Sequence, residues 1–346
     1  MAGKFTVIIT SDRYGADLAT MDIERAVIES CPGMDIELRG VVCSTEDELI
    51  AAGADAEALL VSTREAITRR VLENLPRCKV ISRYGVGLDN IDLVAAADQG
   101  IVVTHFPGYC TAEVADHAFA LILALNRRVV ELDRDLRAGA WTHHGATTTS
   151  ILHGPIRPLR ELTLGIIGFG RIGQSVAKRA VPFGLEVLAA DPYLPQSHSG
   201  LDGVALVSLD ELLSRSDIIS IHCPLTPETR GLIDANALAR LKPGSVIVNT
   251  ARGPIIDLPA AIAGLRAGTL AGAALDVVDP EPLPADSPLY TLPNVILTPH
   301  AAYYSERSVE LVRRETFIEA LTVLKGRQPR TVANPAVLDR ITLAPS

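Results

Sequence analysis

The sequence predicts an α/β protein with two domains, each built on a parallel β-sheet. The length of 346 residues is enough for two domains of about 150 residues each. Short apolar, β-branched runs alternate with segments of helical spacing, first over residues 4–104 and again from residue 163. Strands and helices that alternate with short connections form parallel sheets through right-handed crossovers. The hydrophobic content of 48% and the charged content of 21% allow burial to offset chain entropy, which excludes general disorder.

The first series of elements covers residues 4–104. Strands are expected at residues 4–10, 36–42, 58–62, 79–83 and 101–104, and helices at residues 21–30, 45–52, 65–74 and 90–98. The alternation is interrupted by the segment His105-Phe-Pro-Gly108. Thr111 is a good N-cap, and the spacing predicts a helix from there to Leu136 that stops at Gly139.

The expected helix over residues 111–136 is apolar on nearly all sides, so one sheet face cannot cover it. Burial between domains or between subunits follows from that pattern. Residues 140–162 are irregular, which is typical of an exposed loop or of an arm that lies on a second subunit. His117, on the helix, is interpreted as a satisfied core or interface residue, and His143, His144 and His153 as solvated loop residues rather than metal ligands.

The second series begins at Thr163. Strands are expected at residues 164–168, 186–190, 217–222, 245–249, 272–276 and 295–297, and helices at residues 172–183, 209–214, 235–240 and 258–267. A further helix over residues 305–324 and a polar tail complete the chain.

A glycine-rich turn opens the second series, in Thr163-Leu-Gly-Ile-Ile-Gly-Phe-Gly-Arg-Ile-Gly173. An apolar strand precedes it and a helix follows, as a dinucleotide site requires. Gly168 permits the tight turn, Gly170 lets the backbone approach a pyrophosphate at the helix N-terminus, and Gly173 permits close packing of helix on sheet. Asp191 lies 18 residues after Gly173, where an acid binds the ribose hydroxyls. A carboxylate there repels a 2′-phosphate and residues 192–194 offer no cation, so NAD is favoured over NADP.

Charge and composition exclude several classes of protein. The chain has 32 basic and 41 acidic groups, and the net charge of −9 disfavours a nucleic-acid binder. No run of about 18 apolar residues is present to span a membrane, and the first twenty residues do not form a secretory signal. The five cysteines form no CxxC pair, so no metal site is expected. Disulfides are not excluded by spacing, but buried thiols in a cytoplasmic protein are favoured.

Three polar residues follow expected strands of the second series: Arg252, Glu281 and His300. Ligands bind at the carboxyl ends of strands in such sheets. A histidine can exchange a proton with a hydroxyl or carbonyl, a carboxylate stabilises the protonated ring, and an arginine can hold a substrate carboxylate. The alternative interpretation is that His300 caps a strand and that Arg252 and Glu281 are surface ions.

Several ordered motifs resemble one family over essentially the full length of the chain, the NAD-dependent D-2-hydroxyacid dehydrogenases. The matching segments are Arg83-Tyr-Gly-Val-Gly-Leu-Asp-Asn-Ile-Asp92, Gly168–Gly173, His222-Cys-Pro-Leu-Thr-Pro-Glu-Thr229, Val248-Asn-Thr-Ala-Arg-Gly253, Ala274-Leu-Asp-Val277, Glu281-Pro282 and Thr298-Pro-His-Ala-Ala302. Residues 83–87 and 300–305 are most similar to the branch that contains the C-terminal-binding-protein corepressors.

The resemblance implies roles for individual residues. Arg252 would bind the 2-oxo acid, Glu281 would support the imidazolium, and His300 would be the acid/base. The residues that would contact the cofactor, besides His300, are Val86, Gly168, Gly170, Arg171, Ile172, Gly173, Asp191, Cys223, Pro224, Thr229, Thr250, Ala251 and Asp276. The residues that would contact the substrate are Arg83, Tyr84, Gly85, Val86, Gly87, Arg252, His300 and Tyr303. Tyr303 stands where the corepressor branch has a tryptophan.

The resemblance also implies two Rossmann- or flavodoxin-like doubly wound domains with the active site in the cleft between them. Residues 1–107 and 301–346 would form a discontinuous substrate domain. Residues 108–300 would form the NAD-binding domain, and its first helix and arm would form a homodimer interface. The expected function is NAD(H)-dependent interconversion of a D-2-hydroxy acid and a 2-oxo acid. The alternative is an NAD-sensing, corepressor-like binding protein with secondary dehydrogenase activity.

Overall fold

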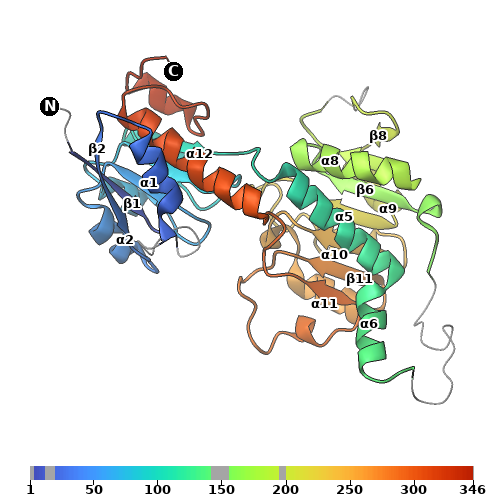
Figure 1. The fold of residues 1–346 in the computed structure, drawn as a ribbon. Helices are drawn as coiled ribbons and strands as arrows, with labels where there is room; N and C mark the ends of the chain where they lie inside the picture. The colour runs from blue at the N-terminus through green and yellow to red at the C-terminus, as the bar shows by residue number, and fades with distance from the viewer. Residues whose placement is uncertain (1–3, 12–19, 142–155, 195–199, 346) are drawn as a thin grey trace. The chain divides into compact units, whose positions relative to one another are not determined.

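The chain folds into two compact units, in a computed structural model that describes residues 4–11, 20–141, 156–194 and 200–345. Unit 1 comprises Met1–Tyr109 and Ser305–Ser346, and unit 2 comprises Cys110–Tyr304. The chain therefore leaves unit 1, builds unit 2 and returns. The expected division at 107/108 and 300/301 lies close to these boundaries. Figure 1 shows the two units with their elements labelled.

Unit 1 is built on a five-stranded parallel sheet of order β2-β1-β3-β4-β5. Its strands are β1 (Lys4–Ile9), β2 (Asp35–Gly40), β3 (Ala58–Val61), β4 (Val80–Arg83) and β5 (Val102–His105). Its helices are α1 (Asp22–Glu29), α2 (Glu46–Gly53), α3 (Arg69–Glu73), α4 (Leu93–Asp98) and α12 (Glu306–Leu324). This strand order is that of flavodoxin-like sheets. Helices α1 and α12 lie side by side although they come from opposite ends of the chain (Figure 1).

The tail after α12 covers the edge strand β5 of unit 1. The Asn334 carboxamide accepts a hydrogen bond from Val103 N at 2.9 Å and donates one to Ile101 O at 2.8 Å. Ala333 N donates to Val103 O. These contacts satisfy backbone groups that an uncovered edge strand would expose.

Unit 2 is built on a seven-stranded parallel sheet of order β12-β11-β10-β9-β6-β7-β8. Its strands are β6 (Thr163–Ile167), β7 (Glu186–Ala190), β8 (Val204–Leu206), β9 (Ile218–Ile221), β10 (Ser245–Asn249), β11 (Leu270–Leu275) and β12 (Val295–Leu297). Its α-helices are α5 (Thr111–Arg127), α6 (Val129–Arg137), α8 (Arg171–Ala180), α9 (Leu209–Arg215), α10 (Ala235–Ala239) and α11 (Leu258–Ala267). Read from β8, the sheet has the 3-2-1-4-5-6 order of dinucleotide-binding folds with one strand added at its end.

Short 3-10 helices complete the elements of both units. They are η2 (Leu159–Glu161), η3 (Val181–Phe183), η4 (Gly253–Ile255) and η5 (Pro288–Tyr290) in unit 2, and η6 (Pro335–Asp339) in unit 1. The sequence does not predict the strand β8, because three residues, none of them buried, carry too little pattern to identify a strand.

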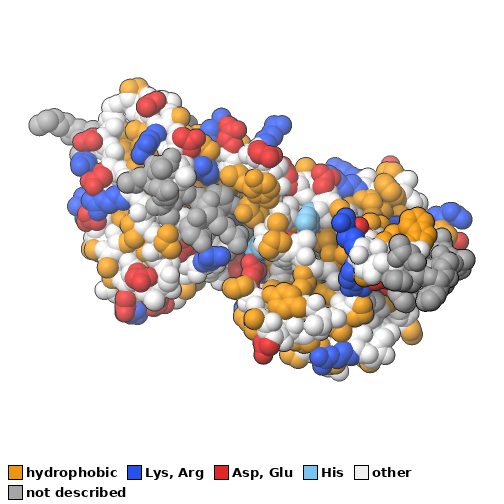
Figure 2. Space-filling model, turned by 60° about the horizontal axis from the view of Figure 1, so that its bottom comes forward, with side chains coloured by type: hydrophobic (Ala, Val, Ile, Leu, Met, Phe, Trp, Pro, Cys, Tyr) orange, Lys and Arg blue, Asp and Glu red, His pale blue; other side chains and the backbone are white. Residues whose placement is uncertain are grey.

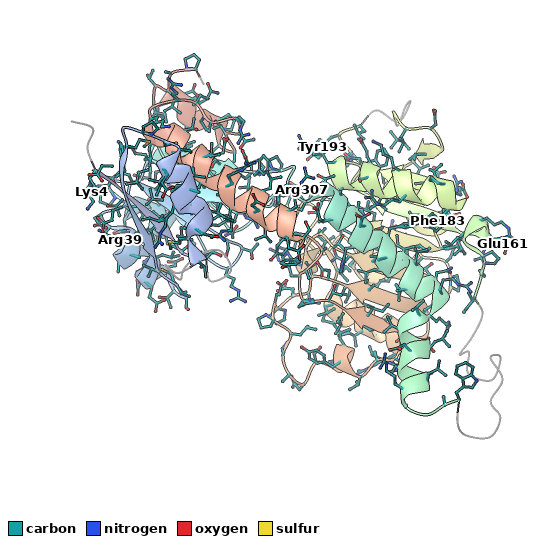
Figure 3. All side chains as sticks on the ribbon, viewed as in Figure 1. Lys4, Arg39, Glu161, Phe183, Tyr193 and Arg307 are labelled. Atoms are coloured by element: carbon teal, nitrogen blue, oxygen red, sulfur yellow. The ribbon has the colours of Figure 1, made fainter. Side chains whose placement is uncertain are left out.

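The sheet of unit 2 is buried on both faces, with one apolar core on each. Ile218 of β9 and Val248 of β10 pack in the core with α5 and α8. The next residue of β9, Ile219, and Ile247 of β10 pack in the opposite core with α9 and α11. This alternation is the period of two that a strand imposes. Phe183, labelled in Figure 3, packs edge-to-face on the α5 core, with its ring centroid 4.9 Å from that of Phe119.

The predicted single helix over residues 111–136 is wrong in the structure. Arg128 adopts a left-handed conformation, with φ of 55°, and divides the segment into α5 and α6. Thr111 is the first residue of α5 rather than its cap, since Cys110 precedes the helix without a side-chain cap. Most of the apolar surface of α5 is covered inside unit 2. Val129 and Val130 of α6 stay exposed.

The predicted helix over residues 65–74 starts later, at Arg69, with Thr68 as its N-cap. The Glu65 carboxylate instead accepts hydrogen bonds from Ser62 N and Ser62 Oγ, at 2.9 and 2.8 Å. Ile67 then forms an isolated parallel bridge with Ile91. Local side-chain bonds and this bridge hold residues 65–67 in a non-helical conformation.

No helix in the described parts of the chain is long and apolar enough to cross a membrane. On the face drawn in Figure 2, lysine and arginine side chains are interspersed with acidic ones rather than gathered into one broad basic surface.

Candidate functional site

The turn between β6 and α8 has the geometry of a dinucleotide-binding turn. Gly168 has φ of +88°, and a Cβ there would lie 2.5 Å from Cys223 N. A Cβ on Gly173 would lie 2.2 Å from Gly168 O, so only glycine fits either position. A Cβ on Gly170 would meet nothing within 4 Å. The backbone at Gly170, at the start of α8, is therefore open to a phosphate group.

The Asp191 carboxylate is fixed beside this turn, directly after β7. Asp191 Oδ2 accepts a hydrogen bond from Phe169 N at 2.8 Å, and Oδ1 accepts one from Tyr193 N at 3.0 Å. Tyr193, labelled in Figure 3, is 87% exposed, and Asp191 itself is half-buried. A negative charge held here suits two ribose hydroxyls and opposes a phosphate.

The turn after β10 holds three of the predicted residues, Thr250, Ala251 and Arg252. The Asn249 side chain shapes the turn, because its Nδ2 donates to Arg252 O at 2.8 Å and its Oδ1 accepts from Ala251 N at 3.0 Å. Arg252 Nη1 donates to Ala251 O at 2.7 Å. The buried Thr250 hydroxyl meets no partner within the described ranges of the chain. A buried polar atom without a partner is suited to bind a ligand.

The segment after β9 contributes Cys223, Pro224 and Thr229. Burial raises the pKa of the Cys223 thiol to about 11, so the side chain is a neutral thiol at pH 7. Thr229 Oγ1 donates to Pro224 O at 2.7 Å and fixes the loop. Because β10, β9, β6 and β7 are neighbours in a parallel sheet, the turns that follow them line one edge.

His222 lies at the start of the same segment and is a neutral residue. Its Nε2 is 2.8 Å from Ser220 Oγ, and burial lowers the pKa of the ring to about 4. The sequence by itself indicates no role for His222 beyond its place in a motif that resembles the family.

His300 and Glu281 are in direct contact, with His300 Nδ1 2.8 Å from Glu281 Oε1. The two residues are 19 positions apart and follow different strands, β12 and β11. The His300 side chain is 18% exposed and that of Glu281 is 36% exposed. Because the carboxylate occupies Nδ1, Nε2 is the nitrogen left for a ligand.

Asp276, after β11, fixes the segment that carries His300. Its carboxylate is buried and accepts hydrogen bonds from Thr298 Oγ1, Ala301 N and Ala302 N, at 2.6, 2.8 and 3.0 Å. Asp276 O accepts a bond from His300 N at 2.8 Å. His300 has φ of 54°, a conformation that non-glycine residues adopt at a cost and that these bonds hold in place. Asp276, predicted to contact the cofactor, thus also positions His300.

His117 of α5 joins the same network, which the sequence reasoning missed. Its Nε2 lies 3.1 Å from Thr298 Oγ1 and 3.6 Å from Asp276 Oδ1. The ring is half-buried and has a hydrogen-bond partner, as expected of a satisfied residue, but that partner belongs to the segment that carries His300. The sequence signal for this contact is weak, because α5 carries other polar residues such as Glu113 and Asp116.

Tyr303 also lies beside His300 in unit 2. The two ring centroids are 6.4 Å apart and the rings are edge-to-face, at 79°. Arg83 and residues 84–87 belong to unit 1, where Arg83 is the buried last residue of β4 and residues 84–87 follow it. Arg171 is exposed and Ile172 half-buried at the start of α8.

No group of three or more histidine, cysteine or acidic residues suited to a metal occurs in the described ranges. His143, His144 and His153 lie outside them.

Comparisons with known proteins agree with this arrangement. Residues 119–302 match the model of the D-isomer specific 2-hydroxyacid dehydrogenase, NAD binding domain. The chain is 42% identical over 268 residues to a D-3-phosphoglycerate dehydrogenase of Mycobacterium leprae, which covers 78% of this chain and 49% of that protein. It therefore spans about half the length of that relative.

Two further proteins are similar over most of their length. A glyoxylate reductase of Thermofilum pendens is 40% identical over 299 residues, which cover 85% of this chain and 86% of that protein. The crystal structure of D-lactate dehydrogenase from Aquifex aeolicus, complexed with NAD and lactic acid, is 31% identical with a TM-score of 0.79. That likeness covers 99% of this chain and 100% of the other.

Proposed function

Because the chain belongs to the D-isomer specific 2-hydroxyacid dehydrogenase family, we propose that it interconverts a D-2-hydroxy acid and a 2-oxo acid with NAD(H). The single observation that carries this proposal is the contact of His300 Nδ1 with Glu281 Oε1 at 2.8 Å. A histidine held this way, next to the turns that suit a dinucleotide, has the geometry of a general acid/base.

The residues present fit NAD. The open backbone at Gly170 would receive the pyrophosphate, the Asp191 carboxylate the ribose hydroxyls, and the orphaned Thr250 hydroxyl a polar group of the cofactor. When bound, NADH supplies the hydride that reduces a carbonyl carbon. The other residues that the family resemblance assigns to the cofactor and to the substrate would contact those two molecules.

The proton chemistry belongs to His300. In reduction, the protonated ring gives a proton from Nε2 to the carbonyl oxygen as that oxygen gains negative charge. In oxidation, the neutral ring takes the hydroxyl proton. Glu281 stabilises the charged ring through Nδ1, and the hydrogen bonds of Asp276 keep the ring in place. Arg252 would hold the substrate carboxylate, since a guanidinium offers a fork of donors to two oxygens.

The test is a panel of 2-oxo acids, including glyoxylate, pyruvate, hydroxypyruvate and 3-phosphohydroxypyruvate, with NADH oxidation followed by absorbance. We expect turnover with at least one acid and a preference for NADH over NADPH. His300→Ala should lower kcat by a factor on the order of 10² while NADH binding persists. A panel without turnover, or a His300→Ala variant of normal kcat, would contradict the proposal. The relatives reported above are named as dehydrogenases or reductases and lend no support to the alternative of a binding protein.

We also propose that the protein is a cytoplasmic homodimer. The five cysteines are free thiols, as a reducing compartment favours. Val129, Val130 and Trp141 expose 56%, 46% and 69% of their surface on and after α6, which supports burial against a second copy. Sedimentation of the wild type and of Val130→Glu tests the dimer, since a charge on this surface should yield monomers. Equal masses of both proteins would contradict the role of this surface.

A further inference from the structure

The loop over residues 84–87 in unit 1 has its carbonyl groups held by donors from within the unit. The first carbonyl, of Tyr84, accepts a hydrogen bond from Arg83 Nη1 at 2.9 Å. The second, of Gly85, accepts one from Phe106 N at 3.1 Å. Both donors come from the ends of β4 and β5, which are neighbouring strands. Hydrogen bonds from two different donors therefore fix the backbone of two successive loop residues.

The third carbonyl, of Val86, is held by a side chain. His105 Nδ1 lies 2.9 Å from Val86 O, and because a carbonyl can only accept, Nδ1 must carry the proton. His105 is the last residue of β5 and is paired with Arg83 in the sheet register. The backbone carbonyl of His105 accepts a hydrogen bond from Thr331 Oγ1 at 2.5 Å, which also fixes the backbone that carries the ring.

With the carbonyl groups of Tyr84, Gly85 and Val86 held by donors of unit 1, the amide groups of the loop remain for an external acceptor. The N–H groups of Gly85, Val86 and Gly87 meet no acceptor among the residues that the structure describes. Gly85 has φ of +129°, and a Cβ there would lie 1.8 Å from Arg83 Nη1. Successive backbone N–H groups beside a buried arginine form a site for an anion such as a carboxylate.

We propose that His105 is a positioning residue for substrate binding, which sets the orientation of the 84–87 loop through its hydrogen bond to Val86 O. This inference rests on the proposed function, because it takes the anion to be the carboxylate of the 2-oxo acid. Without the bond the Val86 peptide can rotate, and rotation turns a carbonyl dipole toward the place of the substrate carboxylate. A carbonyl there repels an anion that an N–H group would bind.

Three variants at one position separate the hydrogen bond from the volume of the ring. His105→Phe keeps an aromatic ring without a donor. His105→Asn places an amide nitrogen where Nδ1 stands. His105→Gln places it near Nε2, too far along the side chain for the same bond. All three are measured as the full-length protein for kcat, for KM of the preferred 2-oxo acid, for the Kd of NADH and for the urea midpoint.

We expect His105→Phe and His105→Gln to raise KM about tenfold or more, with kcat at saturation within about twofold of wild type and an unchanged Kd for NADH. His105→Asn should restore KM to within about threefold of wild type, because it restores the donor. Hydrogen exchange of the peptide that contains residues 84–88 should rise in the Phe variant and stay near wild type in the Asn variant.

The outcomes that overturn the inference are distinct from failure of the proposed function. A wild-type KM in His105→Phe would show that the bond does not matter for substrate. Equal losses in the Asn and Phe variants with a lowered urea midpoint would reduce His105 to a structural role. If the wild type turns over no 2-oxo acid at all, the proposed function fails, and the substrate role of His105 fails with it.

Discussion

His300 Nδ1 and Glu281 Oε1 are 2.8 Å apart, although the two residues follow different strands of the unit 2 sheet. The carboxylate therefore occupies one ring nitrogen and stabilises the protonated ring. Glu281→Gln keeps the shape and a hydrogen-bonding oxygen but removes the charge. We expect kcat for reduction to fall about tenfold, because the ring that donates the proton loses the charge that stabilises it.

The measurement is NADH oxidation with wild type and Glu281→Gln at one pH. Equal kcat values would argue against electrostatic coupling between the two residues.

His117 should act on turnover through the segment that carries His300. Its Nε2 lies 3.1 Å from Thr298 Oγ1. His117→Phe removes that bond, and a small displacement of the acid/base group should lower kcat about tenfold. His117→Gln can place an amide nitrogen where Nε2 stands and should retain most of the turnover. Equal kcat values for Phe, Gln and wild type would show that the contact is not needed.

Asp191 should determine the choice between NADH and NADPH. Asp191→Ser removes the negative charge and the acceptor for Phe169 N and Tyr193 N. The variant also loses the carboxylate that would accept hydrogen bonds from the ribose hydroxyls. We therefore expect the Kd for NADH to rise about tenfold or more. The affinity for NADPH should change less or improve, because repulsion of the 2′-phosphate is removed. Fluorescence titration with both cofactors measures the ratio, and an unchanged ratio is the contrary result.

His222 should make the protein sensitive to acid. Burial lowers its pKa from 6.5 to about 4, so between these values the unfolded chain binds a proton that the folded chain does not. The stability that the neutral His222 ring contributes is therefore fully present above pH 6.5 and is lost as the pH falls from 6.5 toward 4. Through this side chain alone, the free energy of unfolding should be roughly 2 kcal/mol lower at pH 5 than at pH 7. Urea unfolding at pH 7 and pH 5 should show a smaller loss in His222→Gln, and an equal loss in both proteins would contradict the prediction.

Glu24 and Arg313 form a buried ion pair between α1 and α12. Arg313 Nε lies 3.0 Å from Glu24 Oε1, and Glu24 is 0% exposed. Arg313→Met leaves a buried carboxylate without its partner and should cost about 3 kcal/mol or more. The double variant Arg313→Met with Glu24→Met should recover most of that loss, as measured by urea unfolding. A single variant as stable as wild type would show that the pair contributes nothing.

Strand and helix periodicity identified the elements of both sheets because alternating apolar runs are a local property. The predicted strands 186–190, 245–249 and 295–297 and the helix 258–267 have the bounds found in the structure. The predictions were wrong where a single backbone conformation or a local side-chain bond decides the outcome. Arg128 breaks the expected long helix with one left-handed residue, and Glu65 bonds to Ser62 in place of the first helical turn.

The glycine-rich turn and the candidates Arg252, Glu281 and His300 could be selected from the residues alone, because that choice depends on chemistry and on short spacing, whereas their roles came from the family resemblance. Only the folded structure decided which side chains meet. Strand order brings the turns after β11 and β12 side by side, so that Asp276 can hold His300 across 24 residues of sequence. It also brings His117 from α5 to Thr298 and His105 from β5 to Val86. These contacts arise from the crossovers and the sheet register, which no local pattern of residues specifies.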